Sequence, residues 1–303
     1  MPNPHLPSFH RGFTLIEAIM VIVITGIIAS MIAVFIKIPA DGYISATRRA
    51  ELSDIADTTV RRIARDLRLA LPNTVRNPSN GSDQCIEFIP TKVGGRYRAA
   101  ADNVGAIGGD ILDFTAVDNS FDMLWTIANL PAAYRIVAGD IIVVYNDGTT
   151  NGNAYLGTNA IQVASVAPAV SPNSTTITFV GPGAVAAIPF NGKQLPSASP
   201  THRFQVIPVN QHVMAYGCTN GTLRRYVRTL GAPWAQPANC AAMIGGAIYS
   251  QLAQNIATCN LKYEQPGVNT GLGRLGIVSI SLGIDQSGES VNLYHQIHID
   301  TTP

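Results

Sequence analysis

The hydrophobic positions near the N-terminus form one uninterrupted run. No charged side chain lies between Glu17 and Lys37, and the residues of this run leave no polar face. A helix of this length spans about 28 Å, which is close to the thickness of the hydrocarbon layer of a bilayer. Because a helix that is apolar on every side belongs in a membrane or inside an assembly, residues 13–38 are predicted to span a membrane.

The pattern then changes to that of a helix with a single apolar face. Apolar residues recur at steps of three and four, which predicts that residues 39–72 continue the helix and pack on a globular body. Pro39 and Gly42 predict a kink or a local melting of the helix near the junction, and Pro72 predicts its end. Two pairs of charged residues have the spacing of helical ion pairs: Asp57 with Arg61, and Arg62 with Asp66.

Beyond residue 72 the pattern becomes that of short β-strands separated by turn-forming residues. The runs that predict strands are residues 85–89, 110–115, 139–145, 161–163, 175–180, 204–207, 212–216, 222–227, 276–284 and 290–299. Asn-Asp-Gly at 146–148 and Thr-Asn-Gly at 219–221 predict hairpin turns, and residues 285–288 predict the turn between the last two strands.

The remaining segments complete the expected fold. Alanine-rich residues 247–256 predict a short helix, and the clusters of Gly, Pro, Ser and Asn between residues 168 and 200 predict loops. We therefore expect an α+β fold, in which a long N-terminal stem helix packs on an antiparallel, β-rich globular head formed by residues 73–303.

The charged residues beside the apolar run predict on which side of the membrane each of its ends lies. Arg11 is the only formally charged side chain in residues 1–12, so this end is predicted to stay in the cytoplasm and the bulk of the chain to be exported. The net charge of +1 leaves no broad basic surface for nucleic acid, and we expect no such partner. Charged residues make up 13% of the chain, where about a quarter is usual for soluble proteins.

Four cysteines lie beyond the apolar run: Cys85, Cys218, Cys240 and Cys259. An even number in an exported domain predicts two disulfides, with free buried thiols as the alternative. Of the three possible pairings, proximity in sequence favours Cys240–Cys259, which leaves Cys85–Cys218. The spacing does not match that of a zinc site.

Glu17 is the unusual residue of the apolar segment. A carboxylate in lipid costs on the order of a few kcal/mol, so something must compensate for it. A removable secretory signal would have a purely apolar core before its small residues, and a lipoprotein signal would have a nearby cysteine. An ordinary signal anchor remains as an alternative, but it leaves the carboxylate unexplained.

Residues 12–17, with the sequence GFTLIE, resemble the processing motif of type IV prepilins. The resemblance implies that a membrane aspartyl prepilin peptidase cuts between Gly12 and Phe13 and then N-methylates Phe13. It also implies that Glu17 neutralises the terminal amine of a neighbouring subunit in the filament and so fixes the axial register. A buried charge is tolerable when it meets an opposite charge in a low dielectric. Residues 1–12 would be a leader, longer than many in the family, that contains three prolines.

The resemblance extends into the head. The similar segments are residues 85–90, 94–98, 221–226, 259–263 and 289–303. They resemble minor pilins of the PilW and J types, and most of all the MshO group, which serves biogenesis of mannose-sensitive haemagglutinin (MSHA) type IV pili. This implies a pilin-like head.

Candidate chemistry elsewhere in the sequence is sparse. We expect no enzyme, no cofactor and no metal, because no catalytic or phosphate-binding motif stands in a suitable context. His295 and His298 are predicted to lie on opposite faces of a strand. The loop at 146–153 is polar, but a single carboxylate favours a hairpin tip over a calcium site. Arg224 and Arg225 are expected to be solvated.

These features predict a minor pilin-like structural protein that primes or caps assembly of an MSHA-like type IV pilus. Its expected partners are the prepilin peptidase, other minor pilins, the major pilin and the inner-membrane assembly platform. It would cross the inner membrane once, with a periplasmic head, and then join the tip of a pilus. The alternatives are a J-type pseudopilin of a type II secretion system, a tip adhesin that binds a surface ligand, and an anchored periplasmic enzyme.

Overall fold

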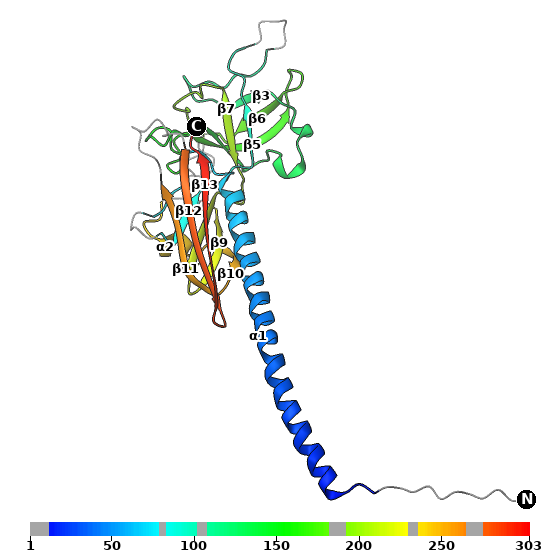
Figure 1. Ribbon diagram of the computed structural model, residues 1–303. Coiled ribbons are helices and arrows are strands. Elements are labelled where there is room, and N and C mark those ends of the chain that lie inside the picture. The colour runs from blue at the N-terminus through cyan, green and yellow to red at the C-terminus, as the bar shows by residue number, and fades with distance from the viewer. Residues whose placement is uncertain (1–11, 79–82, 102–107, 182–191, 230–235, 265–274) are drawn as a thin grey trace, which may run out of the picture. The chain divides into compact units, whose positions relative to one another are not determined.

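The N-terminal helix, α1, runs from Leu15 to Leu67 (Figure 1). The computed structural model describes residues 12–78, 83–101, 108–181, 192–229, 236–264 and 275–303. The chain divides into two units, Met1–Glu51 and Leu52–Pro303, so that α1 contributes to both. The α+β class predicted from the sequence is confirmed, since antiparallel sheets follow the long helix.

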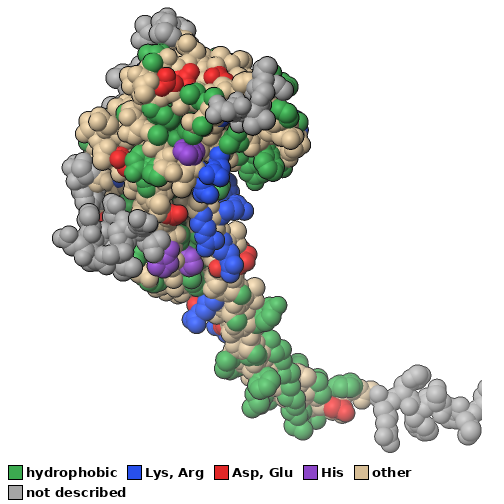
Figure 2. Space-filling model, turned by 90° about the horizontal axis from the view of Figure 1, so that it is seen from above, with side chains coloured by type: hydrophobic (Ala, Val, Ile, Leu, Met, Phe, Trp, Pro, Cys, Tyr) green, Lys and Arg blue, Asp and Glu red, His purple; other side chains and the backbone are tan. Residues whose placement is uncertain are grey.

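The part of α1 in the first unit exposes its apolar side chains. By length and composition it is apolar enough to cross a membrane, and none of its most apolar stretch is buried within the chain. Figure 2 shows hydrophobic side chains over much of this surface. The hydroxyls of Thr25 and Ser30 donate to the carbonyls of Val21 and Ile27, at 2.6 and 2.7 Å. These hydroxyls therefore need no outside partner in an apolar environment.

The predicted melting of the helix at Pro39 does not occur. Residues on both sides of this proline remain helical. A proline removes one backbone donor, and the hydrogen bonds of the neighbouring turns hold the helix.

The predicted end of α1 at Pro72 is also wrong. After Leu67 the chain tightens into a turn, and the N–H of Leu71 donates to the carbonyl of Ile89 at 2.8 Å. Pairing with that segment ends the helix before the proline is reached.

In the second unit the C-terminal part of α1 packs between two antiparallel sheets. One sheet has the order β1-β8-β9-β10 and the other the order β11-β12-β13. Their strands are β1 (Cys85–Phe88), β8 (Val213–Thr219), β9 (Thr222–Arg228), β10 (Ile248–Ala253), β11 (Ile256–Glu264), β12 (Leu275–Gln286) and β13 (Glu289–Asp300). The buried helical residues are Leu52, Ala56, Thr59, Val60, Ile63, Ala64 and Leu67. They share one hydrophobic core with both sheets, as the periodicity predicted.

A carboxylate on α1 pairs with a sheet and not along the helix. Asp57 and Arg61 form the predicted pair at 2.6 Å. Asp66, however, accepts from the hydroxyl of Tyr216 at 2.5 Å and from Arg225 Nε at 3.0 Å. Burial, together with the adjacent Asp66 carboxylate, raises the pKa of Tyr216 well above its ordinary value. Two partners fixed on the sheet outcompete a mobile surface arginine, because exposed helical ion pairs are weak.

The prediction that Arg224 and Arg225 are solvated is therefore wrong. Arg225 is largely buried in its ion pair with Asp66. The guanidinium of Arg224 lies over the ring of Tyr249 on the neighbouring strand, 4.6 Å from its centroid. Both charges thus serve contacts between elements that the sequence pattern does not reveal.

The chain between β1 and β8 forms a separate barrel-like sheet. Its order is β2-β7-β4-β5-β6-β3, and all neighbours are antiparallel. Its strands are β2 (Val93–Arg96), β3 (Ser120–Met123), β4 (Ile141–Val144), β5 (Ala160–Pro168), β6 (Thr175–Phe179) and β7 (Arg203–Ile207), with short 3₁₀ turns η1 (Ile127–Asn129) and η2 (Ala132–Tyr134). A bridge between Tyr97 and Met123 joins its two ends. The enclosed side chains form a core of their own.

Three local predictions are wrong. Residues 247–256 form no helix, since most of them belong to strand β10 (Ile248–Ala253). The short helix α2 (Cys240–Ile244) comes earlier, where Asn239 Oδ1 accepts from the N–H of Ala242 and caps it. Residues 110–115 form no strand, because the carboxylate of Asp113 turns the chain by accepting from the N–H of Thr115. Residues 146–148 form no tight hairpin, since β4 and β5 are joined by a longer loop.

Other predictions are confirmed. The turn at residues 219–221 is a two-residue hairpin with Asn220 and Gly221 at positive φ. The last two strands, β12 and β13, pair around a turn with Ser287 and Gly288 at positive φ. Strands β2, β3 and most of β11 were not predicted, because their residues alternate only weakly between apolar and polar.

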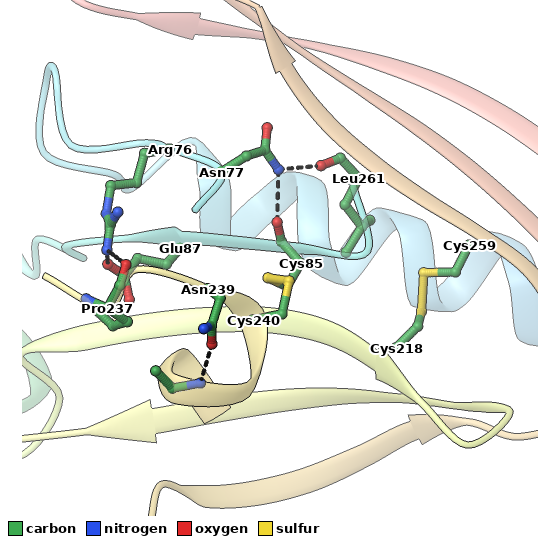
Figure 3. The surroundings of a disulfide bond; sticks show 11 residues. Arg76, Asn77, Cys85, Glu87, Cys218, Pro237, Asn239, Cys240, Cys259 and Leu261 are labelled. Atoms are coloured by element: carbon green, nitrogen blue, oxygen red, sulfur yellow. Dashed lines mark hydrogen bonds and ion pairs between the residues drawn. A yellow bond between two sulfur atoms is a disulfide. The ribbon is translucent and has the colours of Figure 1, made fainter. Parts of the chain in front are cut away.

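All four cysteines form disulfides, but the favoured pairing is wrong. The bonds are Cys85–Cys240 and Cys218–Cys259 (Figure 3). Cys85 lies opposite Gly217 across the β1–β8 pair, so Cys85 and Cys218 project from opposite faces of that sheet. Cys85 faces α2, which carries Cys240. Cys218 instead links its sheet to β11 of the other sheet.

Two polar groups beside the disulfides, Asn77 and Glu87, join separate segments of this body. The amide of Asn77 donates to the carbonyls of Cys85 and Leu261, at 2.7 and 2.6 Å, and so bridges β1 and β11 (Figure 3). The fully buried carboxylate of Glu87 accepts from Arg76 at 2.5 Å and from Arg228 at 2.8 Å. Two guanidinium groups thus surround one charge that has no access to water.

We predict that Ile63→Ala destabilises the second unit strongly. The side chain of Ile63 is 0% exposed in the core beneath α1, so the cavity should lower the free energy of unfolding by about 2–5 kcal/mol. Denaturant unfolding of the full chain in detergent micelles measures this change. The neighbouring exposed Arg62→Ala is the control and should change it by less than about 0.5 kcal/mol. Equal effects of the two variants would contradict the packing.

A second prediction concerns the buried carboxylate of Glu87. Glu87→Ala leaves two guanidinium charges without their partner and should cost about 3–5 kcal/mol of unfolding free energy. The matched control is Glu264→Ala, which breaks an exposed pair with Lys262 and should cost less than about 1 kcal/mol. The same denaturation experiment compares them, and a Glu87→Ala variant as stable as the control would disprove the role of this network.

Candidate functional site

The residues of the predicted processing junction are open to an approaching protein. Gly12, Phe13 and Thr14 precede the first residue of α1 and lie outside any regular element. The side chain of Phe13 is 73% exposed. A Cβ atom placed on Gly12 would meet nothing within 4 Å. The described part of the chain therefore imposes no steric need for glycine at this position. The predicted leader, apart from Gly12, lies outside the described residues.

Thr14 caps the helix that begins directly after the junction. The N–H of Glu17 donates to Thr14 Oγ1 at 3.3 Å and to the Thr14 carbonyl at 3.1 Å. The Thr14 hydroxyl in turn points at Glu17 Oε2, at 3.5 Å. This arrangement is a variant of the capping box, in which a threonine is followed three residues later by a glutamate. This capping role was not predicted, although the Thr-x-x-Glu spacing of residues 14–17 is its sequence signal.

The carboxylate of Glu17 lies in the first turn of α1, where the helix dipole favours a negative charge. Its neighbours along the helix are exposed apolar side chains, among them Ile16 and Met20. Within the described residues no ion pair includes Glu17. In an apolar environment a carboxylate is costly unless it meets an opposite charge.

The remaining candidate residues lie in the second unit. The four cysteines join strands and α2 in two disulfides, so they contribute to stability and offer no free thiol. His295 and His298 lie opposite Ile280 and Ile277 on β12 and project from opposite faces of β13.

The described residues do not meet the requirements of a metal site. Among the described residues there is no cluster of three or more His, Cys, Asp or Glu side chains arranged for a metal ion. In the polar loop at residues 146–153, Asp147 Oδ1 accepts from both the N–H and the hydroxyl of Thr149. This oxygen therefore closes the loop on itself. The absence of a cofactor stays a prediction.

Comparison with known proteins supports the N-terminal site. Residues 8–33 match the family described as the prokaryotic N-terminal methylation motif. No curated protein and no solved structure matches the chain. The motif implies processing by a prepilin peptidase and partners in pilus assembly. The chain thus carries a type IV pilin-like prepilin signal, joined to an apolar helix that is suited to membrane anchoring and to an antiparallel β-rich body.

Proposed function

We propose that this chain is a minor pilin-like structural protein that primes or caps assembly of a type IV pilus of the MSHA kind. The observation that carries the proposal is the N-terminal methylation motif, which leads directly into an exposed apolar helix with a single carboxylate, Glu17, in its first turn. Such a helix needs an apolar environment outside its own chain, first a bilayer and then the stems of other subunits.

The open geometry at Gly12 supports cleavage between Gly12 and Phe13. Because the described fold leaves room for a side chain there, a requirement for glycine would come from the peptidase that approaches it. Thr14 would keep its capping contact with Glu17 after cleavage, so the helix would still begin beside the new terminus. Phe13 would then carry the methylated amine.

Glu17 is proposed to meet the terminal amine of Phe13 in a neighbouring subunit. Exposed apolar residues surround the carboxylate, and packed stems would exclude water from it. Two opposite charges attract strongly in such a low dielectric, and a misaligned subunit would leave one of them unpaired. The contact would therefore set the axial register of the subunits.

The β-rich body is proposed to lie in the periplasm and to contact sister minor pilins, the major pilin and the assembly platform of the inner membrane. A body with two sheets and an additional barrel is too bulky for a densely repeated shaft subunit, which favours a low-copy position at the tip. The segments that resemble MSHA minor pilins lie in or next to β1, β2, β9, β11 and β13. A J-type pseudopilin of a type II secretion system is the second candidate, and filament partners distinguish the two.

We predict that the intact mass of the membrane-extracted chain depends on the peptidase. Co-expression with a prepilin peptidase should remove residues 1–12 and add one methyl group to Phe13. Gly12→Val should block both changes and leave the helix unaltered. The matched control is Gly26→Val, at a glycine of α1 whose Cβ would also meet nothing within 4 Å, and it should be cut normally. An uncut wild-type chain would reduce the segment to an ordinary signal anchor.

We also predict that Glu17→Gln preserves membrane insertion but lowers incorporation. The loss of the charge should reduce co-purification with filaments and with sister minor pilins at least tenfold, since the amine of the neighbouring subunit loses its counter-charge. The control is Glu51→Gln, which removes an exposed carboxylate further along α1. Quantitative mass spectrometry of sheared filaments measures the ratio, and normal incorporation of the Glu17 variant would refute the proposed register contact.

A further inference from the structure

The barrel is an insertion into the body that holds α1. Strands β1 and β8 are neighbours in one sheet, and the barrel is formed by the chain between them. Its interior is a hydrophobic core separate from the one beneath α1. The helix and its two sheets therefore bury their apolar faces without most of the barrel, which leaves the barrel surface available for a task other than holding the stem.

A groove of about 510 Å³ lies on the barrel over strands β2 and β7. Its walls are formed by these two strands, by Met123 at the end of β3 with the two residues that follow it, and by Leu130 after η1. The volume falls within the range of about 300–1,000 Å³ that is typical of sites for small ligands. Polar and apolar groups share its lining, so the groove suits a ligand with both characters.

Two arginines stand side by side in this groove. Arg96 on β2 and Arg203 on β7 are directly opposite in the antiparallel register, and both are exposed. Side chains in such positions start only about 5 Å apart, and like charges there repel. Within the described residues neither forms an ion pair, and Arg96 donates only to the carbonyl of Thr201. An anion between the two guanidinium groups would relieve the repulsion.

An indole and a glycine complete the groove. Trp125 is 56% exposed although it is a large aromatic residue. Its backbone is held on both sides, since its N–H donates to the carbonyl of Met123 and its carbonyl accepts from the hydroxyl of Thr175, each at 2.8 Å. Gly94, two residues before Arg96 on the same face of β2, also lines the groove. A flat apolar face thus stands beside two positive charges.

The C-terminal end of β2, next to the arginines, is already paired with the chain around the end of β3. The N–H of Leu124 donates to the carbonyl of Arg96, and the N–H of Arg98 donates to the carbonyl of Asp122, each at 2.9 Å. An extended peptide that added a strand to β2 beside Arg96 would need these backbone groups. The site therefore favours a compact ligand over an acidic peptide.

We propose that this groove binds a carboxylated saccharide, such as a uronic acid residue of a surface glycan. The carboxylate lies between Arg96 and Arg203, which can each donate two hydrogen bonds in a plane. The apolar C–H face of the sugar ring stacks on the indole of Trp125. This assignment goes beyond the assembly role and does not depend on it, because no residue of the groove belongs to α1.

The test compares two ligands that differ in one carboxylate. Calorimetric titration of the full chain in detergent micelles should show that methyl β-D-glucuronide binds at least tenfold more tightly than methyl β-D-glucoside. Arg203→Gln and Arg96→Gln should each abolish this preference, and Trp125→Ala should weaken binding of both sugars. In a Trp234→Phe background, the fluorescence of Trp125 should respond to the glucuronide.

Controls separate this site from a general attraction of anions. Arg68→Gln removes one exposed arginine in the turn after α1, outside the groove, and should leave the preference unchanged. Thermal unfolding of each variant verifies its fold. Equal affinity for the two glycosides, or an unchanged preference in both arginine variants that are folded, would overturn the proposal. Displacement of the glucuronide by equimolar inorganic phosphate, or tighter binding of a tetraglutamate peptide, would also overturn it.

Discussion

The fold depends on the burial of one face of α1, from Leu52 to Leu67, between two antiparallel sheets. The apolar half of the same helix gains nothing from the chain's own fold, because its side chains remain exposed. The apolar side chains in the two halves of α1 therefore need two different environments. The sheets bury those of the C-terminal half, whereas those of the N-terminal half need an apolar environment outside the chain. The buried face fixes the helix to the body, and the contact of Asp66 with Tyr216 and Arg225 sets its orientation.

Covalent and polar bridges then make the body cohesive. The Cys218–Cys259 disulfide and the amide of Asn77 join the four-stranded sheet to the three-stranded one. The Cys85–Cys240 disulfide holds α2 against the outer face of the first sheet. Such bridges resist separation of the sheets. The barrel is built on this frame as an insertion, so its groove can vary without disturbing the packing of the stem.

The sequence predicted the elements whose signal is local and periodic. The helix, most strands and the turn at residues 219–221 follow from spacing and from residues that accept positive φ. The wrong predictions share a cause, since each depends on a partner distant in the chain. Ile248–Ala253 form a strand because they pair with the edge of β9. Helix α1 ends at Leu67 because the following residues pair with the chain after β1.

The N-terminal site could be predicted from the sequence because all its residues lie within one short segment. A peptidase recognises such a processing motif by its local sequence, so the motif does not depend on the fold. The run of apolar residues and the position of Glu17 likewise need no folding to be seen. The tertiary structure alone decided which cysteines pair, which charges are buried and which arginines face each other across β2 and β7. These are relations between residues far apart in the chain, and only the register of the strands and the faces they bury bring such residues together.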